Sequence, residues 1–377
     1  MTAARIAYVI GTTAGGTGHH VAMLADGCAA RGLAVEVFGP AAARGLFPAV
    51  AFGPVEIGHR VRGAHDGQAT LRLRRLLSRA RPDVVHAHGL RAGAAAALAL
   101  AGPHGRRRGP ALLVTVHNAA PDGAVSRAVY LALERLTARR ADAVLCVSPD
   151  LAGRMRRVGA RDVALTAIPA PAAEPPSAGA TGKARADIGA CGRPVVLAAG
   201  RCARQKGFDT LLAAAASLQH RDPAPLVVIA GDGPLAGRLA AQSRAAGTEV
   251  RFLGQRDDVP ALLAVADVVV VPSRWEGQPL IVQEALRAGR PLVASRVGGI
   301  PALTGEAGAL LVPPDDPGRL ASAVASVLDD PVLSGHLATA ASARAAALPS
   351  PSVAVDAAVA VYARLARHDP PRPDSAA

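Results

Sequence analysis

Short runs of β-branched residues alternate with alanine- and leucine-rich helical stretches along the chain, and this series occurs twice. Several runs are apolar at nearly every position, which is typical of parallel strands covered by helices on both faces. The sequence therefore predicts an α/β protein with two doubly wound, Rossmann-like domains. The predicted strands are residues 6–10, 34–38, 83–88, 111–117, 143–148 and 163–168, then 195–200, 226–231, 250–254, 267–273, 291–295 and 309–314.

The two series are separated by a stretch of proline and small residues, 169–189, which we expect to be a linker between domains 1–168 and 190–350. Ligands of doubly wound sheets bind beyond the carboxyl ends of the strands, so we expect the two domains to face each other across a cleft. Helical patterns occupy about 317–330 and 334–347. We expect a C-terminal helix, 351–368, to pack back on the N-terminal domain, and a disordered tail over 369–377.

The chain is strongly basic, with a net charge of +13 and a pI near 11.0. Such a charge favours anionic partners: nucleotide phosphates, acidic lipid head groups or nucleic acid. Genomic base composition is an alternative explanation of the high arginine and alanine content. Aromatic residues make up only 2% of the chain, which disfavours a surface that stacks nucleic-acid bases.

The cysteines show neither CxxC pairing nor metal-ligand spacing, so we interpret Cys28, Cys146, Cys191 and Cys202 as reduced core residues of a cytosolic protein. The first apolar run is too short for a secretory signal, and the Ala/Leu run around residues 92–102 is shorter than the ~20 residues of a membrane span. We therefore expect a cytoplasmic protein that is soluble or attached to the inner face of a membrane.

The first candidate ligand-binding segment is the glycine-rich turn GTTAGGTGHH, residues 11–20. Gly15 and Gly16 would let the backbone approach a ligand closely, and the N–H groups at the start of the next helix suit an anion. The spacing is not GxGxxG, and no acidic residue follows where a dinucleotide ribose would need one. A tight turn without a ligand remains an alternative.

The second candidate segment is GRCARQKGFD, residues 200–209, directly after a predicted strand. Arg201 and Lys206 would both lie at the carboxyl end of that strand. An arginine fork and a lysine ammonium five residues apart can hold a diphosphate from two sides. Two solvated loop cations are the alternative.

The third segment, SRWEGQPLIVQEA, contains two glutamates that flank the start of a predicted helix. Glu276 would lie in the loop after a strand, Pro279 suits the first turn of the helix, and Glu284 would lie about a turn and a half into it. Free N–H groups between the two carboxylates suit a phosphate. This arrangement fits a phosphorylated sugar, although a solvated loop charge and an ordinary polar helix residue are the alternatives.

In their order along the chain, these segments resemble the family-4 retaining glycosyltransferases of the GT-B fold. The resemblance covers about residues 6 to 330 and departs from the common family pattern at Asn118, Ala302 and the segment 168–176. It rests on the GG turn, HxH and TVH at two strand ends, GRxxxQKG, GDGPL, RFLG, PSxWEGQPLxxxEAxxxGxPxVAS and VGG.

The resemblance implies a nucleotide-diphosphate sugar as donor. Arg201 and Lys206 would bind its diphosphate, with help from the backbone at Gly15 and Gly16, and Glu284 would hold the ribose. Glu276 would contact the transferred sugar. The neighbouring residues Gly277, Pro279 and Leu280 would complete the nucleotide-sugar site.

The resemblance also assigns roles to two histidines. His117 would lie near the sugar and the reacting centre, and His88 would lie on the acceptor side; a structural role is the alternative for each. His86 and His88 would share one strand face without a third ligand, and no DxD segment is present. We therefore expect neither a metal nor another cofactor.

By this resemblance the protein would be a retaining glycosyltransferase that moves a hexosyl group from a UDP- or GDP-sugar to a hydroxyl of a lipid or small-molecule acceptor. The basic amphipathic stretch 71–83 could dock on an anionic membrane, or it could be a solvated helix face. A nucleotide-sugar epimerase of the same fold is an alternative that the glutamate pair disfavours. A non-catalytic nucleotide-sugar-binding protein is another.

Overall fold

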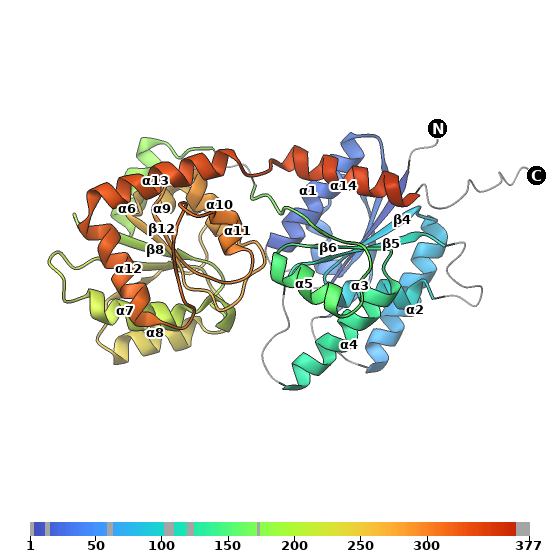
Figure 1. The fold of residues 1–377 in the computed structure, drawn as a ribbon, viewed down its shortest axis with the longest axis horizontal. Helices are drawn as coiled ribbons and strands as arrows, with labels where there is room; N and C mark the ends of the chain where they lie inside the picture. The colour runs from blue at the N-terminus through green and yellow to red at the C-terminus, as the bar shows by residue number, and fades with distance from the viewer. Residues whose placement is uncertain are drawn as a thin grey trace, which may run out of the picture. The chain divides into compact units, whose positions relative to one another are not determined.

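A computed structural model describes residues 4–11, 16–58, 63–101, 109–118, 124–171 and 174–366 of the chain. The chain forms two compact α/β units (Figure 1). Unit 1 comprises Met1–Pro169 and Pro349–Ala377, and unit 2 comprises Ala170–Leu348.

Unit 1 is built on a seven-stranded parallel sheet with the order β3-β2-β1-β4-β5-β6-β7. Its strands are β1 (Arg5–Ile10), β2 (Ala34–Gly39), β3 (Ala51–Pro54), β4 (Val84–His88), β5 (Ala111–Val116), β6 (Ala143–Cys146) and β7 (Val163–Leu165). The edge strand β3 was not predicted, because its sequence AFGP contains glycine and proline, which are depleted in strands.

The helices of unit 1 are α1 (Gly16–Ala30), η1 (Ala41–Leu46), α2 (Gly63–Ala80), α3 (Leu90–Ala99), α4 (Ala124–Arg140), α5 (Pro149–Arg157) and α14 (Pro351–Ala366). Helix α14 packs on α1, and both contribute to one buried apolar cluster with Ile6 and Ile10 of β1. Helix α3 packs on β4 and β5, and α2 and α4 pack on α3 (Figure 1). The last described helix of the chain is therefore part of unit 1.

Unit 2 contains a six-stranded parallel sheet with the order β10-β9-β8-β11-β12-β13. Alternate strand residues enter two separate cores. Val195 and Leu197 pack with α9 (Val259–Val265) and α10 (Leu280–Arg287), whereas Val196 and Ala198 pack with α7 (Phe208–Leu218) and α12 (Pro317–Asp329). The strands are β8 (Val195–Ala199), β9 (Leu226–Ala230), β10 (Val250–Phe252), β11 (Val268–Val271), β12 (Leu292–Ser295) and β13 (Leu310–Val312). The helices are α6 (Ala178–Asp187), η3 (Arg204–Lys206), α7 (Phe208–Leu218), α8 (Ala236–Ala245), α9 (Val259–Val265), α10 (Leu280–Arg287), α11 (Ile300–Thr304), α12 (Pro317–Asp329) and α13 (Pro331–Ala346).

Helix α6 corrects the linker expected over 169–189. The Ser177 hydroxyl caps this helix by accepting a hydrogen bond from Ala180 N at 3.2 Å, and Ala184 and the following Ile188 are buried in the core of unit 2. The helix was missed because its residues are small and only one position in it is fully buried, so no apolar period is visible.

One further expectation, that all the cysteines are core residues, needs correction. Cys28, Cys146 and Cys202 are buried, but Cys191 is exposed, because it lies in a turn with a φ of 42° rather than in a strand. The stretch 71–83 includes much of α2, whose apolar residues Leu73 and Leu77 are already buried in unit 1.

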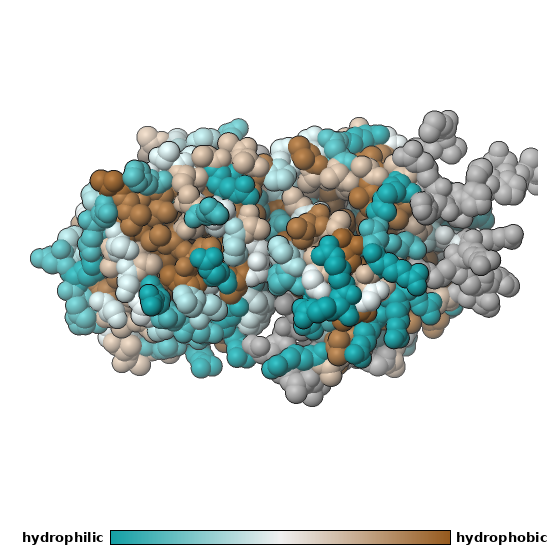
Figure 2. Space-filling model, in the orientation of Figure 1, coloured by the Kyte–Doolittle hydropathy of each residue, from teal (hydrophilic) through white to brown (hydrophobic). Residues whose placement is uncertain are grey.

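The exposed side of α2 is mostly polar, although Leu71 is 56% exposed, and Figure 2 shows hydrophilic residues along the helix. Among the described residues, no single helix is long and apolar enough to span a bilayer; only the broken pair α13 and α14 passes that test of length and composition.

The strand orders of both sheets reverse direction at one point, between β1 and β4 in unit 1 and between β8 and β11 in unit 2. Loops that leave the carboxyl ends of these strands diverge and leave room for a ligand. The segments 200–207 and 272–279 follow β8 and β11, so the topology places both sequence motifs of unit 2 at its reversal point.

Candidate functional site

The centre of the candidate site in unit 2 is an ion pair. Lys206 Nζ lies 2.6 Å from Glu276 Oε1, and the two side chains are 19% and 6% exposed. The pair joins the loop after β8 to the loop after β11, although its members are 70 residues apart in the sequence. The two residues were predicted to hold different parts of a donor, and the structure brings them into direct contact.

Other donors hold the Glu276 carboxylate in place. The Ser273 hydroxyl donates to Oε1 at 2.8 Å, and Gln205 Nε2 lies 3.2 Å from Oε2. A carboxylate can accept about four hydrogen bonds and an ammonium can donate three. Glu276 therefore retains room for a hydroxyl donor, and Lys206 retains N–H groups for an anion.

Two glycines allow the loops to approach this closely. At Gly207, with a φ of 62°, an added Cβ would lie 2.0 Å from Pro272 O; at Gly298, with a φ of 52°, it would lie 1.7 Å from Glu276 O. Both positions combine a left-handed backbone with direct backbone contact, so only glycine fits. The next residue, Gly299, donates its N–H to Gly277 O at 3.0 Å.

Arg201 precedes and Glu284 follows the ion pair in the sequence. Their side chains make fewer polar contacts than those of Lys206 and Glu276. Arg201 is exposed, and within the described ranges no acidic side chain pairs with it. Glu284 is half-buried on α10; burial raises the pKa of its carboxyl, and the charge of Arg287 partly opposes this shift. No residue in the described part of the chain donates a hydrogen bond to the Glu284 carboxylate.

The remaining predicted residues of this site lie around the start of α10. Pro279 is the N-cap residue rather than a residue of the first turn, and Leu280 is the first helical residue. Gly277 and Pro279 are buried, and Leu280 is partly exposed. In unit 1, Gly16 was expected in the turn before the helix and is the first residue of α1, whereas Gly15 lies outside the described residues.

The candidate site in unit 1 is a cluster of buried histidines. Nδ1 of His88, the last residue of β4, lies 3.1 Å from Nε2 of His117, which follows β5, and the two rings are stacked with centroids 5.3 Å apart. His20 of α1 packs edge-on against both rings, and the His86 ring lies 4.1 Å from that of His88. The two predicted histidines are therefore in contact, and they belong to a group of four.

Burial keeps these imidazoles neutral. It lowers the pKa of His117 to about 4, and together with the nearby His117 it lowers the pKa of His20 to about 3. Burial and the neighbouring imidazoles also lower the pKa of His86 and His88 well below the usual value. In the described part of the chain, His20 Nδ1 and His88 Nε2 have no hydrogen-bond partner.

Helix α14 supports this cluster through a chain of hydrogen bonds. The Tyr362 hydroxyl lies 2.7 Å from His86 Nδ1 and 2.9 Å from the Tyr8 hydroxyl, and His86 Nε2 lies 2.7 Å from Thr115 Oγ1. All four side chains are buried. The strands β1, β4 and β5 are thus linked to α14 by polar contacts directly beside the histidines.

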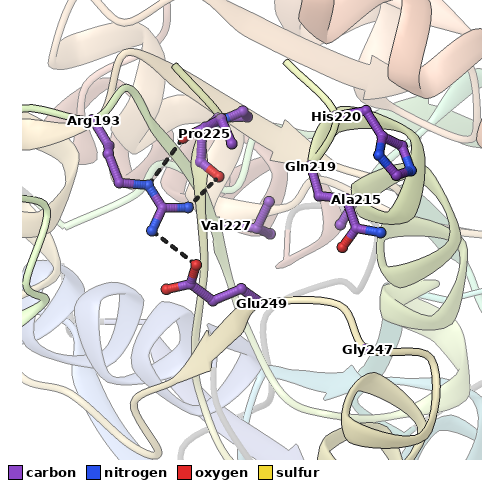
Figure 3. Close-up of a pocket in the computed structure, with 9 residues that line it drawn as sticks. Arg193, Ala215, Gln219, His220, Pro225, Val227, Gly247 and Glu249 are labelled. Atoms are coloured by element: carbon purple, nitrogen blue, oxygen red, sulfur yellow. Dashed lines mark hydrogen bonds and ion pairs between the residues drawn. The ribbon is translucent and has the colours of Figure 1, made fainter. Parts of the chain in front are cut away.

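A cavity of about 370 Å³ in unit 2 lies away from these motifs (Figure 3). Its residues Arg193, Pro225 and Glu249 lie one or two positions before β8, β9 and β10, so the cavity lies at the amino ends of the strands. The Arg193 guanidinium donates hydrogen bonds to the Glu249 carboxylate at 2.8 Å and to the carbonyls of Ala224 and Pro225. The cavity is therefore separate from the candidate site.

Three contributors were missed at the level of the sequence. His20 was overlooked because the turn that contains it was considered only for its glycines, and Ser273 and Gln205 were not assigned because each lies between more conspicuous residues. Among the described residues, no group of three or more histidine, cysteine or acidic side chains is arranged to hold a metal ion.

Comparison with known proteins gives matches in both units. Residues 15–171 match the family model described as "Glycosyl transferase 4-like domain", and residues 193–330 match "Glycosyl transferases group 1". The homologues of this chain are glycosyltransferases.

Three of these glycosyltransferases illustrate the range of similarity. An alpha-D-kanosaminyltransferase of Streptomyces kanamyceticus is 36% identical over 176 residues, covering 45% of this chain and 45% of the relative. A glycogen synthase of Mycobacterium tuberculosis is 33% identical over 281 residues, covering 70% and 64%. A GDP-mannose-dependent alpha-(1-6)-phosphatidylinositol monomannoside mannosyltransferase of Mycolicibacterium smegmatis is 32% identical over 257 residues, covering 63% and 66%. The matches span less than two thirds of the length of these relatives.

Solved structures of GT-B glycosyltransferases share the fold over nearly the full chain. Anabaena HepE in complex with UDP has a TM-score of 0.79 at 19% identity and covers 96% of this chain and 100% of its own. A sucrose-phosphate synthase from Thermosynechococcus elongatus has a TM-score of 0.78 at 23% identity and covers 97% and 100%. These likenesses agree with the predicted fold class of two Rossmann-like domains.

Proposed function

We propose that this protein is a retaining glycosyltransferase that moves a hexosyl group from a UDP- or GDP-sugar to an acceptor hydroxyl. The observation that carries the proposal is the buried Lys206–Glu276 pair at the point where the strand order of unit 2 reverses. A cation and a carboxylate held together there match the two chemically different ends of a sugar diphosphate.

The donor would occupy the loops of unit 2. Arg201, exposed and unpaired among the described residues, and the remaining N–H groups of Lys206 would bind the diphosphate. Glu276 would accept a hydrogen bond from a hydroxyl of the transferred sugar, and Glu284 would accept hydrogen bonds from the ribose. HepE, a neighbour with the same fold, was solved in complex with UDP, and the mycobacterial mannosyltransferase is named GDP-mannose-dependent, so both bases deserve testing.

The transfer breaks the bond between the anomeric carbon and the oxygen of the β-phosphate and forms a bond from that carbon to the acceptor oxygen. Stabilising the negative charge that develops on the diphosphate is the main catalytic task, and Lys206 and Arg201 would perform it. Attack on the face from which the diphosphate departs retains the anomeric configuration. In that route a phosphate oxygen takes the proton of the acceptor hydroxyl.

Unit 1 would serve the acceptor. Neutral imidazoles such as His117 and His88 hydrogen-bond hydroxyls without attracting a second anion. We include lipids among the candidate acceptors, because the mannosyltransferase relative is named for a phosphatidylinositol mannoside. The exposed arginines Arg72, Arg75 and Arg79 on α2 would then favour contact with an anionic membrane at its cytoplasmic face.

The proposal is tested with UDP-, GDP- and ADP-sugars and mass spectrometry of acceptor mixtures that contain lipids and small polyols. We expect release of the nucleoside diphosphate together with a hexosylated product. Glu276→Ala should abolish turnover and retain nucleotide binding, whereas Glu306→Ala, at an exposed glutamate, should leave both turnover and nucleotide binding unchanged.

Other outcomes would contradict this function. Conversion of one nucleotide sugar into another without release of the nucleotide would indicate an epimerase. Nucleotide-sugar binding without any product would indicate a sensor, and salt-sensitive binding to a DNA duplex but not to nucleotides would indicate a nucleic-acid-binding protein.

A further inference from the structure

The guanidinium group of Arg274 joins three separate segments of unit 2. Its Nη1 and Nη2 each lie 2.9 Å from a carboxylate oxygen of Asp209 at the start of α7, in a two-point contact. Its Nε lies 2.7 Å from Asp315 Oδ1, in the loop after β13. The Arg274 side chain is only 17% exposed, less than either of its partners.

Arg274 also fastens the loop after β8 to the loop after β11. Its backbone N–H donates to Gln205 O at 2.8 Å, and its Nη1 donates to Arg204 O at 2.9 Å. In the opposite direction, Gln205 Nε2 donates to Trp275 O at 3.0 Å. The residues that follow these contacts in sequence are Lys206 and Glu276, so the relative position of the two loops sets the geometry of the pair.

The contacts of Arg274 require a guanidinium group. A fork of five N–H donors can serve two carboxylates and a carbonyl at once, whereas a lysine ammonium is a point charge on a flexible stem. Burial alone would raise the pKa of Asp209, but the hydrogen bonds and charge of Arg274 outweigh burial and lower it. Asp209 is therefore firmly ionised near neutral pH and able to hold the fork.

We propose that Arg274 is a positioning residue for the Lys206–Glu276 pair: by clamping Asp209, Asp315 and the Arg204 carbonyl, it fixes the two loops at the distance that glycosyl transfer requires. This inference rests on the proposed function. A displacement of reacting groups by about 1 Å can reduce turnover roughly 100-fold. Arg274→Lys should therefore lower kcat by one to two orders of magnitude and change KM for the donor much less.

The chain offers a matched control in Arg193. This arginine also bonds a carboxylate and two carbonyls, but at the amino ends of the strands (Figure 3). Arg193→Lys removes a similar set of contacts from the same sheet. It should lower the melting temperature without changing kcat.

A second measurement does not depend on activity. Trp275 is the only tryptophan of the chain and lies in the clamped loop. In Arg274→Lys, acrylamide should quench its fluorescence more strongly than in the wild type, and in Arg193→Lys equally to the wild type. Asp315→Asn, which weakens one arm of the clamp, should give an intermediate value and serves if Arg274→Lys fails to fold.

Stronger quenching together with a loss of kcat in Arg274→Lys would support the proposal. Unchanged quenching, or a loss of kcat no larger than in Arg193→Lys, would overturn it. If the wild type transfers no sugar from any donor, the proposed function fails, while the quenching result still decides whether Arg274 fixes the loop.

Discussion

The two units have sheets that reverse at the same point in strand order, yet they place opposite chemistry there. Unit 2 places a lysine, an arginine and two glutamates at the strand ends, with the central carboxylate held by three donors. Unit 1 places four neutral imidazoles, two of whose nitrogens have no partner among the described residues. In doubly wound folds the topology fixes where a ligand can bind, and the loops decide whether that place suits an anion or a hydroxyl.

The largest expected effect concerns the ion pair of unit 2. Lys206→Ala leaves the Glu276 carboxylate buried without its cation, and breaking a buried pair costs about 3 kcal/mol. Urea unfolding followed by Trp275 fluorescence measures this loss, and Lys206→Ala/Glu276→Ala should recover part of it.

The exposed pair of Lys183 and Asp187 on α6 provides the control. Lys183→Ala should cost less than about 0.5 kcal/mol. Equal losses from Lys206→Ala and Lys183→Ala would show that the central pair is only a surface contact.

The second prediction concerns acid and the histidines of unit 1. The folded pKa of His117 is lowered from 6.5 to about 4, so the unfolded chain binds more protons between these values. The contribution of His117 to the free energy of unfolding is thus complete above pH 6.5, and it falls by roughly 3 kcal/mol as the pH drops to about 4. Urea unfolding between pH 7 and 4 measures how the free energy of unfolding changes with pH.

Imidazole signals in NMR spectra test the same claim residue by residue. The signals of His117 and His20 should keep their neutral shifts at pH 5.5, and replacement of the exposed His336 by glutamine should leave the slope of stability unchanged. Protonation of the buried rings near pH 6.5 would contradict the account.

The third prediction concerns Gly298 in unit 2. Gly298→Ala would force a Cβ to within 1.7 Å of Glu276 O, so we expect a loss of about 2 kcal/mol and a large drop in turnover. Gly237 on α8 has no atom within 4 Å of an added Cβ, so Gly237→Ala should be neutral or stabilising by about 0.5 kcal/mol. Thermal unfolding and activity are measured for both variants. Equal stability and equal turnover of Gly298→Ala and Gly237→Ala would contradict the prediction.

The smallest effect is expected from Tyr362→Phe in unit 1. Loss of this hydroxyl leaves His86 Nδ1 without a partner and leaves the Tyr8 hydroxyl only its weak contact with Cys28 Sγ at 3.4 Å, at a cost of about 1–2 kcal/mol. Tyr130→Phe, at a half-buried tyrosine on α4, should change the unfolding free energy by less than about 0.5 kcal/mol. An unaltered unfolding midpoint in Tyr362→Phe would show that the polar chain does not support unit 1.

Much of the fold could be predicted because its strands are buried on both faces and read as continuous apolar runs. The segments 200–209 and 276–284 could be found for a related reason: loops that follow such runs lie at the carboxyl ends of the strands. Helix α6 could not be found, because alanine and glycine leave no apolar period. The stretch 71–83 showed its amphipathic pattern but not what covers its apolar side.

Contacts between segments that are distant in the sequence could not be predicted either. The pairing of Lys206 with Glu276 joins residues 70 positions apart, and the link from Tyr362 to His86 spans 276. Motif spacing says nothing about which loops meet. The role of Arg274 was hidden for the same reason, since its partners Asp209 and Asp315 lie in two other loops.

The central claim is that the charged loops of unit 2, rather than the histidines of unit 1, hold the donor. Titration of the full chain with UDP and GDP, followed by Trp275 fluorescence at several salt concentrations, tests it most directly. Arg201→Ala should weaken binding of the preferred nucleotide at least about 10-fold and reduce its salt dependence, whereas His117→Gln should stay within about twofold of the wild type. Equal affinity of Arg201→Ala and the wild type for both nucleotides, or a loss of binding in His117→Gln alone, would contradict the account.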